Sequence, residues 1–210
     1  MMFHPLRAIP QTARSSDPVW RPYFEAHAQE LASLGARPAV LVDVCSQPVR
    51  RASELYQLFH QGHHAPRGAL PGKALANCLM GSAIAPPHEI VLNAFTLAVY
   101  DQIMQTLEVP PHFVSALVLT YRGVVEFTEE CLPGVIVDIN HMAELLRKAT
   151  GSAGQFVLRE CTRCGCIVAT VNVIESAMAP CAVCAALKEK RRRQEADHAR
   201  RRRRPRGASE

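Results

Sequence analysis

Five of the eight cysteines in this 210-residue chain fall within residues 161–184. Four of them form two C-x-x-C pairs, Cys161/Cys164 and Cys181/Cys184, separated by sixteen residues. This pattern is typical of zinc sites, because Zn²⁺ prefers four soft ligands in a tetrahedral arrangement and each C-x-x-C turn brings two thiolates to one metal. We therefore predict one Zn²⁺ per chain. A site of four thiolates has no open position for water, so it would be structural rather than catalytic.

A redox dithiol and an iron–sulfur cluster are the alternatives for these cysteines. A redox motif would lie in a thioredoxin-like βαβ context, which this sequence lacks, whereas the spacing alone leaves the cluster open. Cys166 could replace Cys164 as a ligand, although the regular spacing favours Cys164. The remaining cysteines, Cys45, Cys78 and Cys131, stand alone in apolar or helical patterns and are predicted to be buried thiols.

The residues between and around the cysteine pairs predict a small module over 153–187. Residues 166–174 are β-branched and apolar enough for a strand. Gly165 permits the turn with positive φ that a metal knuckle needs. The module has too little apolar mass to fold alone, so metal binding is expected to supply much of its folding free energy.

Positive charge is concentrated at the C-terminal end of the sequence. Residues 185–210 hold eleven Lys/Arg and four Asp/Glu, a net charge of +7, whereas the rest holds thirteen and fifteen, a net charge of −2. Because like charges repel and little apolar surface is present, residues 188–210 are predicted to be a disordered Arg-rich tail. Such a tail is attracted to DNA, RNA and anionic membranes. A solvated tail that only improves solubility is the alternative.

The remainder of the sequence predicts a mainly α protein. An irregular N-terminal extension, residues 1–22, precedes a helical domain over 23–152. Apolar residues recur at helical spacing, and Pro and Gly mark the starts and ends of the segments. The helices are expected at about 23–34, 37–45, 49–62, 88–108, 110–130 and 137–151.

Residues 36–61 are a helix-turn-helix candidate. Two helices with a three-residue polar break match this motif, whose second helix enters the major groove of DNA with its N-terminal side chains nearest the bases. Those side chains are Arg50, Arg51, Ser53 and Glu54, and arginine is the commonest reader of guanine. Two core helices with an exposed basic turn are the alternative. The opposite side of the second helix carries Ala52, Leu55, Tyr56 and Phe59, which are expected to pack inward.

The sequence offers little support for catalysis or for a membrane protein. No phosphate loop, nucleophile elbow or dinucleotide fingerprint is present. No stretch reaches the roughly 18 uncharged apolar residues that a spanning helix needs, and the N-terminus has no apolar run of signal-peptide length. We therefore expect a cytoplasmic protein that is not an enzyme and has no membrane partner.

Four features of the sequence occur in a fixed order: "ELASLGAR" (30–37), "RRASELYQLFHQ" (50–61), "PRGALP" (66–71) and the two cysteine pairs with their sixteen-residue gap. Together they resemble the C subunit of FlhDC, the bacterial flagellar master regulator. The resemblance covers roughly residues 25–185. The chain has one tryptophan, Trp20, where the family commonly has several, a departure compatible with a divergent or paralogous member.

The resemblance implies a mostly helical transcription activator, with a zinc site made here by Cys161, Cys164, Cys181 and Cys184. It implies partnership with a small helical FlhD-type subunit, binding of double-stranded DNA at flagellar promoters, and recruitment of RNA polymerase. Arg50 and Arg51 would contact DNA, and Arg67 in the connector is a further candidate. A zinc-ribbon interaction or RNA-binding module, with non-specific polyanion binding through the tail, is the alternative function.

Overall fold

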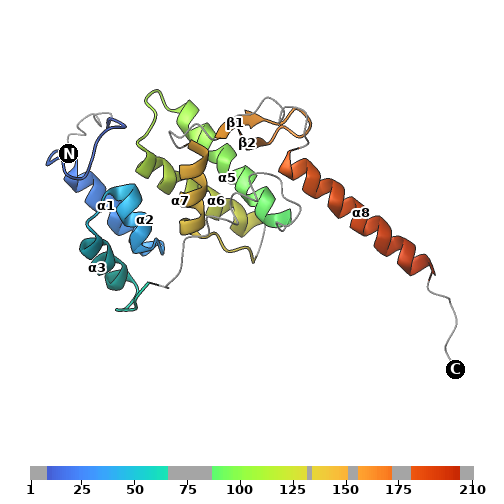
Figure 1. The fold of residues 1–210 in the computed structure, drawn as a ribbon, viewed down its shortest axis with the longest axis horizontal. Coiled ribbons are helices and arrows are strands. Elements are labelled where there is room, and N and C mark those ends of the chain that lie inside the picture. The colour runs from blue at the N-terminus through green and yellow to red at the C-terminus, as the bar shows by residue number, and fades with distance from the viewer. Residues whose placement is uncertain (1–8, 66–86, 132–133, 151–155, 172–180, 204–210) are drawn as a thin grey trace.

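The computed structural model describes residues 9–65, 87–131, 134–150, 156–171 and 181–203. Within these ranges the chain is mainly helical with one two-stranded sheet (Figure 1), which confirms the predicted fold class at this level. No helix in these ranges is both long and apolar enough to cross a membrane. The helices are α1 (Arg21–Ser33), α2 (Pro38–Cys45), α3 (Val49–Phe59), α5 (Pro87–Thr106), α6 (Phe113–Cys131), α7 (Ile139–Thr150) and α8 (Ala182–Arg203).

Prolines and glycines set the boundaries of the N-terminal helices, as the sequence predicts. α1 begins two residues before the expected start, after turns within residues 9–20. It ends at Ser33, and Gly35 follows two residues later with a φ of +91° that favours glycine and an N–H that donates to the Ala32 carbonyl. α2 then begins at Pro38, which has no N–H to leave unsatisfied in a first helical turn.

A tight turn over residues 46–48 joins α2 to α3. Ser46 adopts the left-handed conformation with φ of +51°, and the N–H of Gln47 donates to the Leu41 carbonyl. Pro48 precedes the first residue of α3. The two predicted helices and their three-residue break are therefore present, and α1 packs against both of them.

The inward face of α3 differs from the prediction at one residue. Leu55 and Tyr56 are buried as expected, but the Phe59 side chain is 41% exposed. The His60 ring stacks on Tyr56 at a centroid distance of 4.3 Å, and its Nε2 donates to the Ala32 carbonyl at 3.0 Å. His60 therefore covers this end of α1, and Phe59 turns toward solvent.

The larger of two hydrophobic clusters in the described residues joins α1, α2, α3, α5, α6 and α7. Cys45 lies in it, and burial raises the pKa of its thiol to about 12. Cys131 is exposed, contrary to prediction, because it is the last residue of α6, where the chain leaves the core. Cys78 lies outside the described residues. The largest fully buried side chains are Phe24, Leu31, Leu41, Leu55, Leu97, Leu117, Ile139, Leu145 and Leu146.

Asn140, at the start of α7, ties that helix to the corner between α1 and α2. Its Oδ1 accepts the backbone N–H of Arg37 at 2.7 Å. Its Nδ2 donates to the Gly35 carbonyl at 3.1 Å and to Asp138 Oδ1 at 2.8 Å. The α2–α3 pair is thereby held in a fixed position relative to α7.

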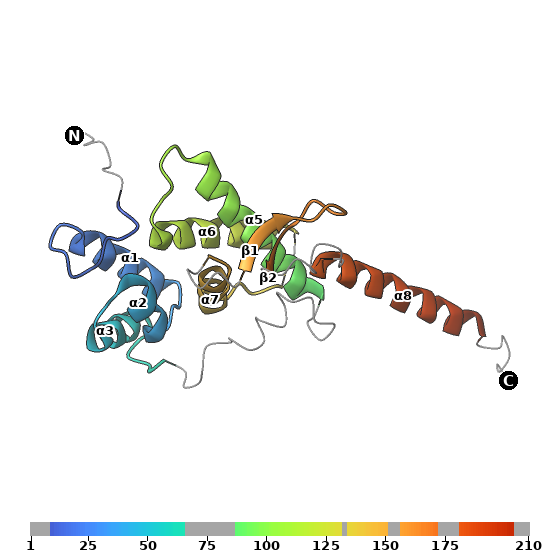
Figure 2. The ribbon, with the colours of Figure 1, turned by 45° about the horizontal axis from the view of Figure 1, so that its top comes forward.

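The two strands, β1 (Phe156–Glu160) and β2 (Ile167–Val171), form an antiparallel hairpin in which Phe156 pairs with Val171 and Glu160 with Ile167. β2 falls within the segment 166–174, for which the sequence predicts a strand. The hairpin packs against α5 and α7, so the cysteine module rests on the helical domain (Figure 2).

The prediction of a disordered tail over 188–210 is wrong as far as Arg203, because α8 is one continuous helix of 22 residues. The predicted boundary at residue 187 also falls inside this helix, so the module and the basic segment are continuous. The physical reason is composition. Ala, Leu, Lys, Arg, Gln and Glu are strong helix formers, and no Gly or Pro interrupts the segment before Pro205.

Candidate metal centre

The first cysteine pair lies in the turn that connects β1 to β2. The Cys161 N–H donates to the Cys166 carbonyl and the Gly165 N–H donates to the Cys161 carbonyl, both at 2.9 Å. Gly165 has φ of +71°, a conformation that strains any residue with a Cβ. The predicted role of this glycine in a tight knuckle is therefore confirmed.

The second pair lies at the start of α8. Cys181 directly precedes the helix, and Cys184 is in its first turn. The Cys184 N–H donates to Cys181 Sγ at 3.3 Å, so the sulfur of Cys181 takes the place of the oxygen that usually caps a helix N-terminus. The Cys181 sulfur can therefore both cap the N-terminus of α8 and bind a metal ion.

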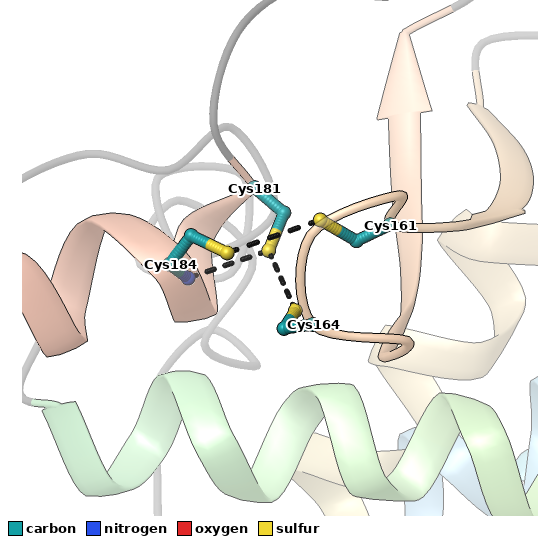
Figure 3. A group of neighbouring side chains, drawn as sticks. All are labelled: Cys161, Cys164, Cys181 and Cys184. Atoms are coloured by element: carbon teal, nitrogen blue, oxygen red, sulfur yellow. Dashed lines mark hydrogen bonds between the residues drawn. The ribbon is translucent and has the colours of Figure 1, made fainter.

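The two pairs come together as four sulfurs that all lie within 4.8 Å of one another (Figure 3). Cys161 Sγ is 3.9 Å from Cys184 Sγ, and Cys164 Sγ is 3.4 Å from Cys181 Sγ. These distances are too long for disulfides. Four sulfurs bound tetrahedrally at 2.3 Å would be separated by about 3.8 Å. The cluster therefore could bind one metal ion with only small side-chain adjustments.

Helix α5 forms the floor of this cluster. Ile90 and Ala94 are buried against Cys161 and Cys181, and Figure 3 shows α5 running beneath the sulfurs. An apolar floor limits the access of water to one side of a bound ion. Sequence reasoning missed these two residues, because nothing in the spacing of the cysteines indicates which of the preceding helices will lie beneath them.

Cys166 packs beside the cluster but is not among the four sulfurs that lie within 4.8 Å of one another. Burial raises the pKa of its thiol to about 11, with smaller contributions from Cys164, Cys181 and Cys161. The geometry thus favours Cys164 over Cys166 as the second ligand of the first pair, in agreement with the regular spacing.

Cys161 differs in acidity from Cys181 and Cys184. Hydrogen bonds from the backbone of Arg163 and Cys164 lower the pKa of Cys161 to about 6. Burial raises the pKa of Cys181 to about 12 and also raises that of Cys184. Because only thiolates bind such metals well, loading the site must release protons, and metal affinity will fall on acidification.

Three of the predicted DNA contacts, Arg50, Arg51 and Ser53, lie on α3 and not beside the cysteine cluster. The Arg50 side chain is 93% exposed, and its Nε donates to Glu54 Oε1 at 2.9 Å. Arg51 is less free, because its guanidinium pairs with Glu25 on α1. The Ser53 hydroxyl donates to the Val49 carbonyl of its own helix at 3.0 Å. Arg67 lies outside the described residues.

A second concave site lies between α5 and α7. This pocket of about 240 Å³ has mainly apolar walls, and its polar lining residues are Glu89, Asn93, Thr96, Asp138 and His141. His141 Nε2 lies 3.1 Å from Asn93 Oδ1, and burial lowers the pKa of the His141 ring. In the described ranges, the four cysteines are the only group of three or more His, Cys, Asp or Glu residues close enough to bind a metal ion.

No protein-family model matches this sequence, and no curated protein matches it. Its function is therefore inferred from the residues and their geometry.

Proposed function

We propose that this chain is a cytoplasmic, zinc-binding and DNA-binding subunit of a transcription activator of the FlhC type, and not an enzyme. One observation carries this proposal: a cluster of four thiols fixes the start of an exposed basic helix. A closed site of four cysteines organises structure rather than catalysing a reaction. The basic helix is suited to a phosphate backbone.

Zn²⁺ is the metal that we assign to Cys161, Cys164, Cys181 and Cys184. The set contains only sulfur, and small side-chain adjustments would bring its separations to those around a tetrahedral ion. Soft thiolate ligands favour zinc, Cu(I) and iron–sulfur clusters over magnesium or calcium. A colourless protein containing one zinc atom per chain would distinguish zinc from an iron–sulfur cluster.

The metal assignment is tested with two matched cysteine variants of the full chain. Cys181→Ser should purify without zinc, and the hairpin and the start of α8 should lose protection from hydrogen exchange while the helices α1–α3 and α5–α7 keep theirs. Cys166→Ser should keep one zinc per chain. Equal zinc loss in both variants, measured by elemental analysis, would contradict the ligand set.

We propose that α2, the turn at 46–48 and α3 form a helix-turn-helix. Its support is the pair of helices with a left-handed Ser46 between them, and α1 packed across both. The N-terminal half of α3 presents Arg50 to solvent, which is the position from which recognition helices read bases. The Glu25 carboxylate restrains the guanidinium of Arg51. A restrained guanidinium is suited to contacting a phosphate at a fixed position on the DNA backbone.

The C-terminal half of α3 is assigned to an FlhD-type helical subunit. The Leu58 side chain is 70% exposed and Phe59 is 41% exposed. We take these two residues as the contact surface for the partner, because contiguous exposed apolar patches mark protein–protein interfaces. Flagellar promoters and RNA polymerase are the remaining partners of the proposal, and their support is the resemblance of the sequence segments.

The competing function is a zinc-ribbon interaction or RNA-binding module. The exposed lysines and arginines of α8 favour it as much as they favour DNA binding, because polyanion attraction carries no sequence information. Under this alternative, promoter and shuffled duplexes would bind equally, and binding would be weak and steeply dependent on salt.

Binding to two duplexes separates these functions. The zinc-loaded full chain, co-purified with an FlhD-type subunit, is titrated against a flagellar promoter duplex and a shuffled duplex at two salt concentrations. We expect a preference for the promoter of about 10³ or more.

Arg50→Ala should reduce this preference by about tenfold, since it removes a base-reading side chain. Arg122→Ala, which removes another exposed arginine paired with a carboxylate, Glu30 on α1, is the matched control and should leave the preference unchanged. Equal affinity of the wild type for both duplexes would refute the activator assignment.

A further inference from the structure

We infer that α8 is itself a DNA-binding element, which lies as a continuous basic helix in the major groove of duplex DNA and supplies much of the affinity. This inference rests on the proposed DNA-binding function and names the segment that contacts the phosphates. It also replaces the expectation that the basic residues act as a disordered tail.

The backbone of α8 provides a long, preformed rod. It runs for 22 residues, or about 33 Å, and it extends away from the helical body in both views (Figures 1 and 2). Its contacts with the body are mainly with α5 near the cysteine cluster. Most of its length is therefore available to a partner as large as a DNA duplex.

Basic side chains line the helix from its second turn onward. Residues 182–203 hold nine Lys/Arg and three Asp/Glu, a net charge of +6. The side chains of Lys188 and of residues 190–193 are exposed, and the backbone of Arg200–Arg203 forms the last turn. Duplex DNA carries one negative charge per roughly 1.7 Å of axis. Phosphates are therefore available for contact along the whole length of a basic helix such as α8.

The shape of the grooves favours duplex DNA over duplex RNA. An α-helix with its side chains is about 10–12 Å across, and the major groove of B-DNA is about 12 Å wide. The major groove of A-form RNA is too deep and narrow for such a helix. Because α8 is already helical, binding avoids the cost of ordering a flexible segment.

The cysteine cluster fixes the direction in which α8 leaves the body. Cys181 and Cys184 hold its first turn through the Cys184 N–H bond to Cys181 Sγ and through the sulfur cluster with Cys161 and Cys164. Figure 1 shows α3 and α8 on opposite sides of the body. Contacts made by α8 therefore do not compete with contacts made by α3 for the same stretch of DNA.

Two variants of Ala196, an exposed residue in the middle of α8, separate a groove-binding helix from a flexible cationic tail. Ala196→Pro interrupts the helix and Ala196→Gln keeps it, while both leave the net charge unchanged. Circular dichroism of the metal-loaded full chain should show a loss of helix in the proline variant only.

Binding of a DNA duplex, and of an RNA duplex of the same sequence, is then measured at several salt concentrations. The wild type and Ala196→Gln should prefer DNA by about tenfold, and Ala196→Pro should lose most of that difference and about tenfold in DNA affinity. If the proline variant loses helix but binds DNA like the wild type, or if both duplexes bind the wild type equally, α8 acts as a flexible polycation and the inference is wrong.

A charge variant provides a second measurement. Replacing Arg191, Arg192 and Arg193 by Gln should make the negative slope of log affinity against log salt shallower by about 2.7, or about 0.9 for each phosphate that an arginine no longer neutralises. The triple variant should lose affinity by the same factor for promoter and shuffled duplexes. Failure of the activator assignment is a different result, in which the wild type itself binds the two duplexes with equal affinity. An unchanged slope would place α8 away from the phosphates.

Discussion

Replacement of Asn140 tests directly how the proposed helix-turn-helix, α2 and α3, is held against α7. The Asn140 amide satisfies the Arg37 N–H and the Gly35 carbonyl in the loop between α1 and α2, and it also donates to Asp138. The Asn140 residue is only 6% exposed, so water has little access to replace these bonds. Asn140→Ala removes all three interactions while leaving α7 with a better helix former.

The expected loss of stability follows from these bonds. Removing a hydrogen-bond partner from a poorly solvated backbone group costs about 1 kcal/mol or more. With two backbone groups and part of the Asp138 interaction affected, Asn140→Ala should lower the free energy of unfolding by about 2–3 kcal/mol. This is a large share of the roughly 5–15 kcal/mol that stabilises a typical domain.

Urea unfolding of the metal-loaded full chain measures this loss, with an unchanged m-value as evidence that only stability has altered. Gln102→Ala is the matched control, because it removes an amide whose hydrogen bond to Thr106 is exposed, and it should change stability by no more than about 0.5 kcal/mol. A loss below about 0.5 kcal/mol in Asn140→Ala would show that Asn140 does not hold the α1–α2 corner.

Two further predictions concern pH and packing. Burial, and then the neighbouring His27, lower the pKa of His112 from its usual 6.5. As the pH falls, the His112 ring therefore takes up a proton in the unfolded chain before it does so in the folded chain. The contribution to stability is fully present above pH 6.5 and is lost as the pH falls toward the lowered pKa of the folded state. His112→Gln should flatten the pH dependence of unfolding between about pH 7 and 5, and an unchanged slope would contradict this role. Leu55→Ala, at a fully buried position, should cost about 2–5 kcal/mol, whereas Leu58→Ala on the same helix should cost less than about 0.5 kcal/mol; equal losses would mean that Leu58 is packed.

Local signals in the sequence predicted the parts of the fold that depend on neighbours along the chain. Gly35 and Pro38 marked the end of one helix and the start of the next, because one tolerates positive φ and the other needs no N–H partner. The apolar spacing in α3 predicted the buried Leu55 and Tyr56. Phe59 was misassigned because periodicity does not show where a helix leaves its packing surface.

The error at α8 has a different cause. High net charge and low hydropathy predicted disorder, but those measures ignore the intrinsic helix propensity of Ala, Lys, Arg, Gln and Glu. They also ignore the anchoring of the helix start by Cys181 and Cys184. An anchored first turn removes the unfavourable nucleation step, after which each added residue extends the helix at little cost.

By itself, the sequence determined the candidate ligand set and the local elements. Four cysteines in two C-x-x-C pairs, a glycine in the knuckle and a β-branched segment after it are local patterns with local physical causes. Tertiary structure decided what those elements meet. It placed Ile90 and Ala94 beneath the sulfurs, Glu25 against Arg51, and Asn140 in the α1–α2 corner. These contacts join residues that lie 26 to 105 positions apart in the sequence. They depend on how whole helices pack, which no pattern within a short stretch of sequence encodes.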